Sequence, residues 1–211
     1  MKQVLGILGG GRYGRLVAEL ALLTGNFESV RFFDDSLPVD GERIVGRTEE
    51  VLAWQRSGRI SHAAVAIGYK HFARREELFD LLQPHMPLPA LIHPRAVVSP
   101  SARLGDGVQL FALACVETEA TLGNNVTVFN QSTIAHDARI DAHTFLSIGV
   151  AMGGGIHIGK RTFVGVNAAL VNDISVGDDC VVCGGTFLTD SIGPETTVIG
   201  NPWRTITGTE L

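Results

Sequence analysis

A column of apolar residues recurs at every sixth position between Leu91 and Ile192. When the chain is divided into blocks of six from Leu91, the second residue of seventeen consecutive blocks is aliphatic or methionine. These residues are Ile92, Val98, Leu104, Leu110, Val116, Leu122, Val128, Ile134, Ile140, Leu146, Met152, Ile158, Val164, Leu170, Val176, Val182 and Leu188. An α-helix needs a period of 3.6 and a simple strand a period of two, so the period of six indicates a parallel β-helix.

Three such blocks make one coil of a β-helix, so residues i and i+18 are expected to stack at about 4.8 Å, the usual strand spacing. The second position then points inward, as does the sixth, which holds small or β-branched residues. Pro194 interrupts the column, so we expect the regular coils to end there and to need a cap. We expect the glycines that share the position next to the column to turn corners with positive φ. They are Gly105, Gly123, Gly149, Gly159 and Gly177.

The first ninety residues instead alternate strand-like and helical segments, which predicts a small parallel sheet. The pattern places strands at 4–8, 30–33 and 63–67, and helices at 15–23, 48–56 and 72–82. Thr48 is the expected N-cap of the second helix. Three prolines within residues 84–89 mark a boundary. We therefore expect an α/β Rossmann-like domain over residues 1–90, and an all-β left-handed parallel β-helix with a C-terminal cap over residues 91–211.

The first predicted strand is followed by a glycine-rich loop. Gly9, Gly11 and Gly14 have the spacing of the dinucleotide fingerprint, and Asp34 lies twenty residues beyond Gly14. Glycines let backbone N–H groups approach phosphate at a helix N-terminus. The domain is about half the usual size of a dinucleotide-binding domain. We favour a diphosphate site over an NAD site because of what the second domain is expected to do. Glycines that serve only a tight turn remain the alternative.

Composition narrows the choice of partners. The net charge of −5 and the pI near 5.8 argue against a nucleic-acid-binding surface. No apolar run reaches eighteen residues, so no membrane span is expected, and the first residues do not resemble a cleavable signal. Three cysteines do not make a disulfide framework, and Cys180-x-x-Cys183 lacks the second pair of a zinc site. We expect Cys180 to pack in the inward sixth column, and the protein to be cytoplasmic.

Four short segments, in this order and spacing, resemble the landmarks of a known family. They are Leu91-Ile92-His93-Pro94, Ile134-Ala135-His136-Asp137, Ser147-Ile148-Gly149 and Gly200-Asn201-Pro202. With the N-terminal domain, they make the whole chain similar to the bacterial hexapeptide-repeat sugar acetyltransferases grouped with the sialic acid O-acetyltransferases. The pattern is most similar to the nucleotide-linked amino-sugar N-acetyltransferases of bacillosamine and perosamine pathways. This resemblance implies a nucleotide sugar in the N-terminal domain, and acetyl-CoA along the β-helix between subunits of a homotrimer.

The same resemblance implies that His136 is the general base. It would remove a proton as the sugar amine attacks the thioester carbonyl, while Asp137 orients the ring and stabilises its cation. An imidazole suits this role because its ordinary pKa lies close to working pH. His136 is fourth in its block, away from the core column, so it can face a ligand or a neighbouring subunit. A surface histidine at a corner is the alternative.

Gly154 lies eighteen residues after His136, so it is expected on the same face, one coil further on. Gly153, Gly154 and Gly155 expose backbone whose N–H groups can bind an oxygen that gains negative charge. The resemblance matches Gly154 to the backbone donor for the acyl carbonyl and places Gly149 in the acyl-CoA site. Glycines required only for a tight corner are the alternative.

For the nucleotide sugar, the resemblance points to the glycine loop and the ends of neighbouring strands. The implied residues are Gly9, Gly11, Arg12, Tyr13, Gly14, Asp34, Asp35 and Gly68. Asp34 and Asp35 match an acidic pair near the base, where carboxylates accept hydrogen bonds. A turn that ends the second strand is the alternative reading of this pair.

Phe129 and Phe145 depart from the family pattern, because many relatives have asparagine or histidine there. We expect both in the acceptor pocket, where they would change the sugar or acyl specificity. Tyr13 departs similarly from a common histidine. His143 and His157 differ from His136 in block position, so no metal site is expected.

Three functions remain open from the sequence. The first is acetyl transfer to the amino group of a UDP- or GDP-linked amino-deoxy sugar. The second is O-acetyl transfer to a sugar hydroxyl of the sialic acid type, with the same groups. The third is non-catalytic nucleotide-sugar binding. For all three functions, we expect neighbouring chains to cover some of the apolar residues that lie outside the core column. These are Leu113, Phe129, Phe145, Phe163 and Phe187.

Overall fold

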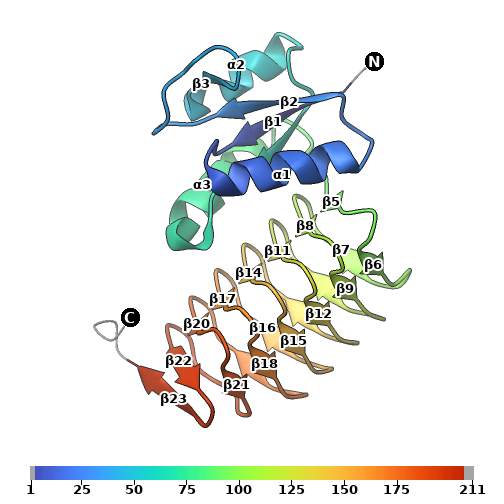
Figure 1. Ribbon diagram of the computed structural model, residues 1–211, viewed down its shortest axis with the longest axis vertical. Helices are drawn as coiled ribbons and strands as arrows, with labels where there is room; N and C mark the ends of the chain where they lie inside the picture. Colours follow the sequence, from blue (N-terminus) through green and yellow to red (C-terminus); the bar gives the residue numbers. More distant parts are fainter. Residues whose placement is uncertain (1–2, 207–211) are drawn as a thin grey trace. The chain divides into compact units, whose positions relative to one another are not determined.

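A computed structural model describes residues 3–206 of the chain (Figure 1). The chain divides into two compact units, one ending at Pro94 and the other beginning at Arg95. This division falls four residues after the boundary expected from the prolines, and each unit has its own architecture. None of the helices in the described residues has the length and apolarity that a membrane span needs.

The N-terminal unit is built on a four-stranded parallel sheet of order β3-β2-β1-β4. Its elements are β1 (Val4–Leu8), α1 (Arg12–Leu23), β2 (Ser29–Phe33), β3 (Ile44–Gly46), α2 (Val51–Arg56), β4 (His62–Val65) and α3 (Phe72–Leu82). Short 3₁₀ segments at Thr48–Glu50 and Tyr69–His71 precede α2 and α3. The sheet and its helices confirm the expected α/β fold, and strand β3, which has three residues, is an addition.

Helices cover both faces of this sheet. The apolar residues of α2 and α3, among them Val51 and Phe79, pack with Leu8 and Phe33 in one buried cluster. Helix α1 lies against the other face, where Gly14 approaches Phe32. The carboxyl ends of the strands remain free for loops, and in parallel sheets such ends are where ligands bind.

The start of the second helix differs from the prediction. Thr48 is the first residue of a 3₁₀ turn and does not act as the N-cap of α2. Asp35 performs the capping from another segment, because its carboxylate accepts hydrogen bonds from the Thr48 backbone N–H at 2.9 Å and hydroxyl at 2.7 Å. Glu50 accepts the Arg47 N–H at 2.7 Å. Helix α1 also begins three residues earlier than expected, at Arg12.

The second unit is a parallel β-helix of two-residue strands (Figure 1). The strands are β6 (Val97–Val98), β7 (Arg103–Leu104), β8 (Gln109–Leu110), β9 (Cys115–Val116), β10 (Thr121–Leu122), β11 (Thr127–Val128), β12 (Thr133–Ile134), β13 (Arg139–Ile140), β14 (Phe145–Leu146), β15 (Ala151–Met152), β16 (His157–Ile158), β17 (Phe163–Val164), β18 (Ala169–Leu170), β19 (Ser175–Val176), β20 (Val181–Val182) and β21 (Phe187–Leu188). Strand β5 (Leu91–Ile92) opens the hexapeptide repeat. Each strand pairs in parallel with the third strand before or after it, so residues i and i+18 stack as predicted.

Three sheets result, each named here for its first strand. The β6 sheet contains β6, β9, β12, β15, β18 and β21; the β7 sheet contains β7, β10, β13, β16 and β19; the β8 sheet contains β8, β11, β14, β17 and β20. The apolar column is the second residue of every strand, and it is buried from Leu110 to Leu188. Polar side chains in the inward sixth column donate hydrogen bonds to backbone carbonyls of the next coil. The Thr162 hydroxyl, for example, donates to the Gly177 carbonyl at 2.9 Å. Cys180 packs fully buried in the same column.

The corners differ from the prediction. Every sixth residue from Gly107 to Gly185 has a positive φ, and this is the fifth position of each block, which most coils fill with other residues. Of the five glycines assigned to corners, only Gly149 has this conformation, with φ of 68°. The other four occupy the third position, where a side chain has no space. A Cβ at Gly123, for example, would lie 2.8 Å from the Ala142 nitrogen in the following coil.

The regular coils end close to Pro194, as the break in the column predicted. β21 is the last two-residue strand, and Ile192 makes only an isolated bridge to Val176. Strand β22 (Thr197–Gly200) then continues the β8 sheet in parallel, and β23 (Trp203–Ile206) pairs with β22 in antiparallel fashion. This hairpin forms the C-terminal end of the described residues, and residues 207–211 of the expected cap lie outside them.

Candidate active site

His136 lies at the corner that follows β12, between the β6 and β7 sheets. Its Nδ1 lies 2.8 Å from Oδ2 of Asp137, and both side chains are about two-thirds exposed, at 61% and 66%. Asp137 occupies the left-handed fifth position, with φ of 59°. The His136 backbone N–H donates to Oε2 of Glu117 in the preceding coil at 3.1 Å. The hydrogen bond to Asp137 raises the pKa of His136 above its ordinary 6.5, and the charges of Asp137, Glu117 and Asp173 add to the effect.

The imidazole ring lies directly over Gly154, as the eighteen-residue stacking predicted. A Cβ on Gly154 would come within 2.5 Å of Nε2 and 3.0 Å of Nδ1, so this ring position requires glycine. The Gly155 N–H donates to the His136 carbonyl at 2.9 Å and fixes the two coils together. The Gly154 N–H donates to no acceptor among residues 3–206. A basic nitrogen and a bare backbone N–H are therefore adjacent at this corner.

The neighbouring glycines make room for the next coil. At Gly153, Gly155 and Gly149, a Cβ would collide with a side-chain oxygen of the following coil, from Asn172, Asp173 and Asn167 respectively. Packing of the coils therefore explains these three glycines. Their expected contact with acyl-CoA stays a prediction.

Phe129 and Phe145 lie together, but away from His136 within one chain. Their ring centroids are 5.2 Å apart, in a ladder that Phe111 and Phe163 extend at 4.4 Å and 6.1 Å. Phe145 belongs to β14 in the β8 sheet, whereas His136 lies at the corner between the other two sheets. Phe145 is only 6% exposed, so it needs no neighbouring chain to cover it. Phe187 and Leu113, at 40% and 44%, remain open to solvent.

The two unassigned histidines do not join His136. His143 is buried, with Nδ1 at 3.2 Å from the Asn125 amide nitrogen. His157 lies on the β7 sheet, with Nε2 at 2.8 Å from Asp141, which also accepts Arg139 Nε at 2.9 Å. No group of three or more metal-ligating side chains gathers anywhere in residues 3–206.

In the N-terminal unit, the glycine loop connects β1 to α1 and lies at the carboxyl end of the sheet. Gly9 has φ of 109°, and a Cβ there would lie 3.0 Å from the Ala66 carbonyl carbon. Gly14 lies so close to the Gly9 carbonyl that no side chain fits. Gly11, in contrast, has open space around it, so the loop's own packing does not require glycine at this position. The first and third glycines of the motif are thus explained by packing, and the second is not.

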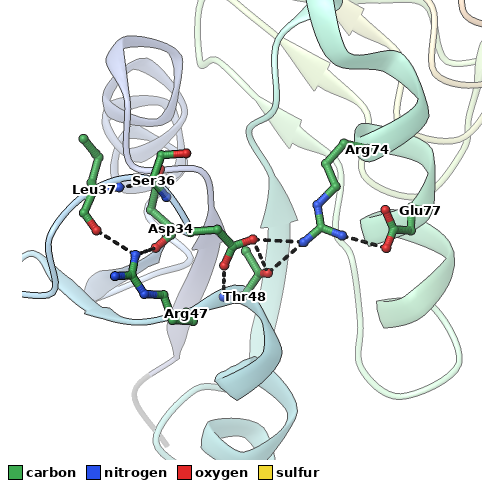
Figure 2. Close-up of polar contacts among 8 residues, drawn as sticks. Asp34, Ser36, Leu37, Arg47, Thr48, Arg74 and Glu77 are labelled. Carbon is green, nitrogen blue, oxygen red and sulfur yellow. Dashed lines mark hydrogen bonds and ion pairs between the residues drawn. The ribbon is translucent and has the colours of Figure 1, made fainter.

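Asp34 ties this loop to the turn that follows β2. Its Oδ2 accepts the Gly10 N–H at 2.6 Å, and its Oδ1 accepts the N–H groups of Ser36 and Leu37 at 2.8 Å and 2.9 Å. Arg47 donates to the carbonyls of Asp34 and Leu37, both at 2.9 Å, as Figure 2 shows. The expected ligand-binding acid is therefore also the residue that shapes the loop.

Asp35 joins a second network with Thr48 and Arg74. Arg74 donates from Nη2 to Asp35 Oδ2 and to Thr48 Oγ1, both at 3.0 Å, and from Nη1 to Glu77 at 2.6 Å (Figure 2). The hydrogen bonds from Thr48 and Arg74 lower the pKa of Asp35, although burial acts in the opposite direction. The carboxylate is thus held ionised at the strand end.

Several residues of these two networks line a pocket of about 270 Å³. Its lining is Gly9, Asp34, Asp35, Ser36, Thr48, Ile67, His71, Arg74 and Leu78. The sequence reasoning found Gly9 and the two aspartates but missed Thr48, His71 and Arg74. His71 and Arg74 lie three residues apart around the start of α3, and Thr48 comes from a distant segment, so no short motif connects all three.

Arg12, Tyr13 and Gly68 lie near this pocket in the fold but do not line it. Arg12 begins α1 and is exposed, next to Tyr13, which bonds to the fully buried Arg75 of α3. Gly68 precedes the 3₁₀ segment before α3 and has open space at its Cα. Their expected contacts with the nucleotide sugar stay predictions.

Fold and corner geometry together define a class of protein, a hexapeptide-repeat acyltransferase with an N-terminal α/β domain. Residues 4–82 match the PglD N-terminal domain family, and residues 155–190 match the hexapeptide repeat of succinyl-transferase. No curated protein sequence matches the chain.

Solved structures make the relationship specific. The acetyltransferase domain of PglB from Neisseria gonorrhoeae, in complex with acetyl coenzyme A, is 30% identical with a TM-score of 0.89, covering 98% of this chain and 100% of that one. The perosamine N-acetyltransferase PerB from Caulobacter crescentus, in complex with CoA and GDP-perosamine, is 29% identical with a TM-score of 0.90, covering 98% of each chain. The chain belongs to this family of left-handed β-helix sugar acetyltransferases, as its sequence landmarks indicated.

Proposed function

We propose that this protein transfers an acetyl group from acetyl-CoA to the amino group of a nucleotide-linked amino-deoxy sugar. The observation that carries the proposal is the His136–Asp137 pair stacked over the bare backbone of Gly154. The bound ligands of the related PglB and PerB structures, acetyl coenzyme A in one and CoA with GDP-perosamine in the other, support the substrate class. A second support is the N-terminal pocket at the carboxyl end of a parallel sheet.

His136 acts as the general base in this mechanism. With Nδ1 held by Asp137, Nε2 carries the lone pair that accepts a proton from the sugar amine as its nitrogen attacks the thioester carbon. The negative charge that develops on the carbonyl oxygen is stabilised by the Gly154 N–H. Collapse of this intermediate breaks the carbon–sulfur bond, and the proton held by the imidazolium passes to the departing CoA sulfur. Asp137 stabilises the imidazolium throughout.

We assign the nucleotide sugar to the N-terminal pocket. The glycine loop offers the N-terminus of α1 and the open site at Gly11 for the diphosphate. Asp34 and Asp35, with Thr48 and Arg74, offer acceptors and donors for the nucleoside. Gly9, Arg12, Tyr13, Gly14 and Gly68 complete the proposed site.

A homotrimer with active sites between subunits fits the outer face of the β6 sheet. The outward first residues of its strands carry no charge: Val97, Cys115, Thr133, Ala151, Ala169 and Phe187. His136 lies on the edge of this face, so a neighbouring subunit packed there would complete its surroundings. A partner at this corner would also bring Phe129 and Phe145 of one chain towards His136 of another. We also propose a cytoplasmic location, where the three free cysteines stay reduced.

The test is release of free CoA thiol from acetyl-CoA with a panel of UDP-, GDP- and dTDP-linked amino sugars. We expect release with one amino sugar, and a loss of about a hundredfold or more in His136→Ala, in the range of general-base catalysis. His157→Ala is the matched control, because it removes a second His–Asp pair from the same β-helix. Release of CoA thiol only with acceptors that offer a sugar hydroxyl would show that the reaction is O-acetylation and not N-acetylation. Full activity in His136→Ala, or no acetyl-CoA binding, would overturn the proposal.

A further inference from the structure

Glu117 has a geometry that the His–Asp pair does not account for. It precedes His136 by nineteen residues, in the coil before, and its half-buried side chain reaches across to the corner. There its Oε2 accepts the His136 backbone N–H at 3.1 Å. Two other fourth-position N–H groups, those of Asp106 and Lys160, donate to side chains of the following coil, at 3.0 Å and 2.8 Å. At His136 the acceptor is a carboxylate that comes instead from the preceding coil.

The charge of Glu117 acts on the same imidazole. Three carboxylates face His136, one from each of three coils: Asp137 from its own coil, Glu117 from the preceding coil, and Asp173 from the coil after Gly154. Asp173 reaches this place because Gly155 has no side chain to block it. Each negative charge favours the protonated ring, which is the form that exists after the base has taken the amine proton.

Glu119 provides a contrast within the same corner. It lies one coil before Asp137 in the left-handed fifth column, and its side chain is exposed. Its carboxylate makes no hydrogen bond to the described residues and is absent from the groups that shift the pKa of His136. Glu119 is therefore a nearby glutamate that lacks the contact with His136.

We propose that Glu117 is a positioning residue for the general base, which holds the His136 backbone in place and sets a second carboxylate beside the corner. This inference rests on the proposed function, since it assigns a role within that reaction. In this role Glu117 acts through His136 and not by contact with a substrate. At this corner, carboxylates from successive coils would then hold the general base His136. The Gly153–Gly155 segment, which has no side chains, would leave space for the acyl group.

A pH profile separates this role from a structural one. The neutral ring is the active form, so activity rises as pH passes upward through the pKa of His136. In Glu117→Gln the amide still accepts the backbone N–H, but the charge is gone, so the midpoint falls. Relative to wild type, the variant gains activity on the acid limb and loses about threefold on the plateau, a small part of the general-base contribution. Glu117→Ala also loses the acceptor and is expected to fall at every pH, with Gln restoring part of the loss.

Ring titration gives a readout that does not depend on turnover. The His136 Cε1–H signal, assigned by its absence in His136→Ala, is followed by NMR against pH in wild type, Glu117→Gln and Glu119→Gln. We expect a lower midpoint in Glu117→Gln only, and a difference that shrinks at high salt. A wild-type titration in Glu117→Gln, or an equal shift in Glu119→Gln, would overturn the proposal. A failure of the proposed acetyltransferase function would give a different result, namely unimpaired CoA release in His136→Ala.

Discussion

At the scale of single residues, the pair of His136 and Asp137 sets how activity depends on pH. The folded pKa of His136 is raised, and the base must be neutral, so the acid limb of kcat/KM is expected to have its midpoint above 6.5. Asp137→Asn should move this midpoint downward and lower the plateau, because the imidazolium loses its main stabilising charge. Asp141→Asn, which alters the second His–Asp pair, should leave the midpoint in place. An acid limb unchanged by Asp137→Asn would contradict the assigned role.

Gly154 gives a second test at this scale. Alanine would place a methyl group where the His136 ring now lies, 2.5 Å from Nε2. Since the ring is exposed, it can swing aside at little cost in stability, but the base then leaves its position. Displacement by about 1 Å is enough for a hundredfold loss in kcat, which we expect for Gly154→Ala with a nearly unchanged melting temperature. Gly193→Ala, at a glycine with open space, is the control, and equal activities of the two variants would refute the prediction.

At the scale of elements, the loop between β1 and α1 depends on one carboxylate. Asp34→Ala removes the acceptor of the Gly10, Ser36 and Leu37 N–H groups, so the loop loses its fixed shape. We expect KM for the nucleotide sugar to rise about tenfold or more, because binding must then order the loop. KM for acetyl-CoA should change little.

Asp40→Ala is a matched control for the loop. Asp40 also accepts three backbone N–H groups, those of Glu42, Arg43 and Ile44, but it is not part of the pocket lining. A rise in KM that is equal in both variants would mean a general loss of structure in the domain.

Among the elements, the coils could be predicted from the sequence, whereas the corners and the long-range contacts could not. The coils were predicted in register because seventeen repeats of one pattern leave a single way to bury the column, and the i+18 rule placed His136 over Gly154. The corners were assigned wrongly because glycine was taken as a sign of positive φ. At Gly123 the cause is instead the close approach of the next coil, which no local pattern records. The hydrogen bonds that Asp35 makes with Thr48 and with Arg74 were not predicted, for the same reason. These contacts link segments that are far apart in the chain.

At the scale of the whole molecule, charge is distributed unevenly along the chain. Residues 1–94 contain eleven Lys and Arg and eleven Asp and Glu, so the net charge of −5 falls entirely on residues 95–211, with six and eleven. Against that background, the uncharged first positions of the β6 sheet stand apart from those of the β7 sheet, which include Arg103, Arg139 and His157. The first positions of the β8 sheet are also uncharged, but none of them is exposed in the single chain: Gln109, Thr127, Phe145, Phe163 and Val181. The β6 sheet is therefore the uncharged face with exposed first positions, which favours contact with another copy of the chain.

Ala151 tests that assembly, because it is exposed in the single chain and central on the β6 sheet. Glutamate at this position can be solvated in a monomer but would be buried without a partner in a trimer, which is strongly unfavourable. We therefore expect Ala151→Glu to fold and to run as a monomer in light scattering. Its activity should fall at least tenfold, since His136 on the edge of this face would lose its neighbouring subunit. Thr121→Glu, on the exposed β7 sheet, should remain trimeric and active. A trimeric, active Ala151→Glu would exclude the β6 sheet as the interface, and an active monomer would mean that each chain carries a complete site.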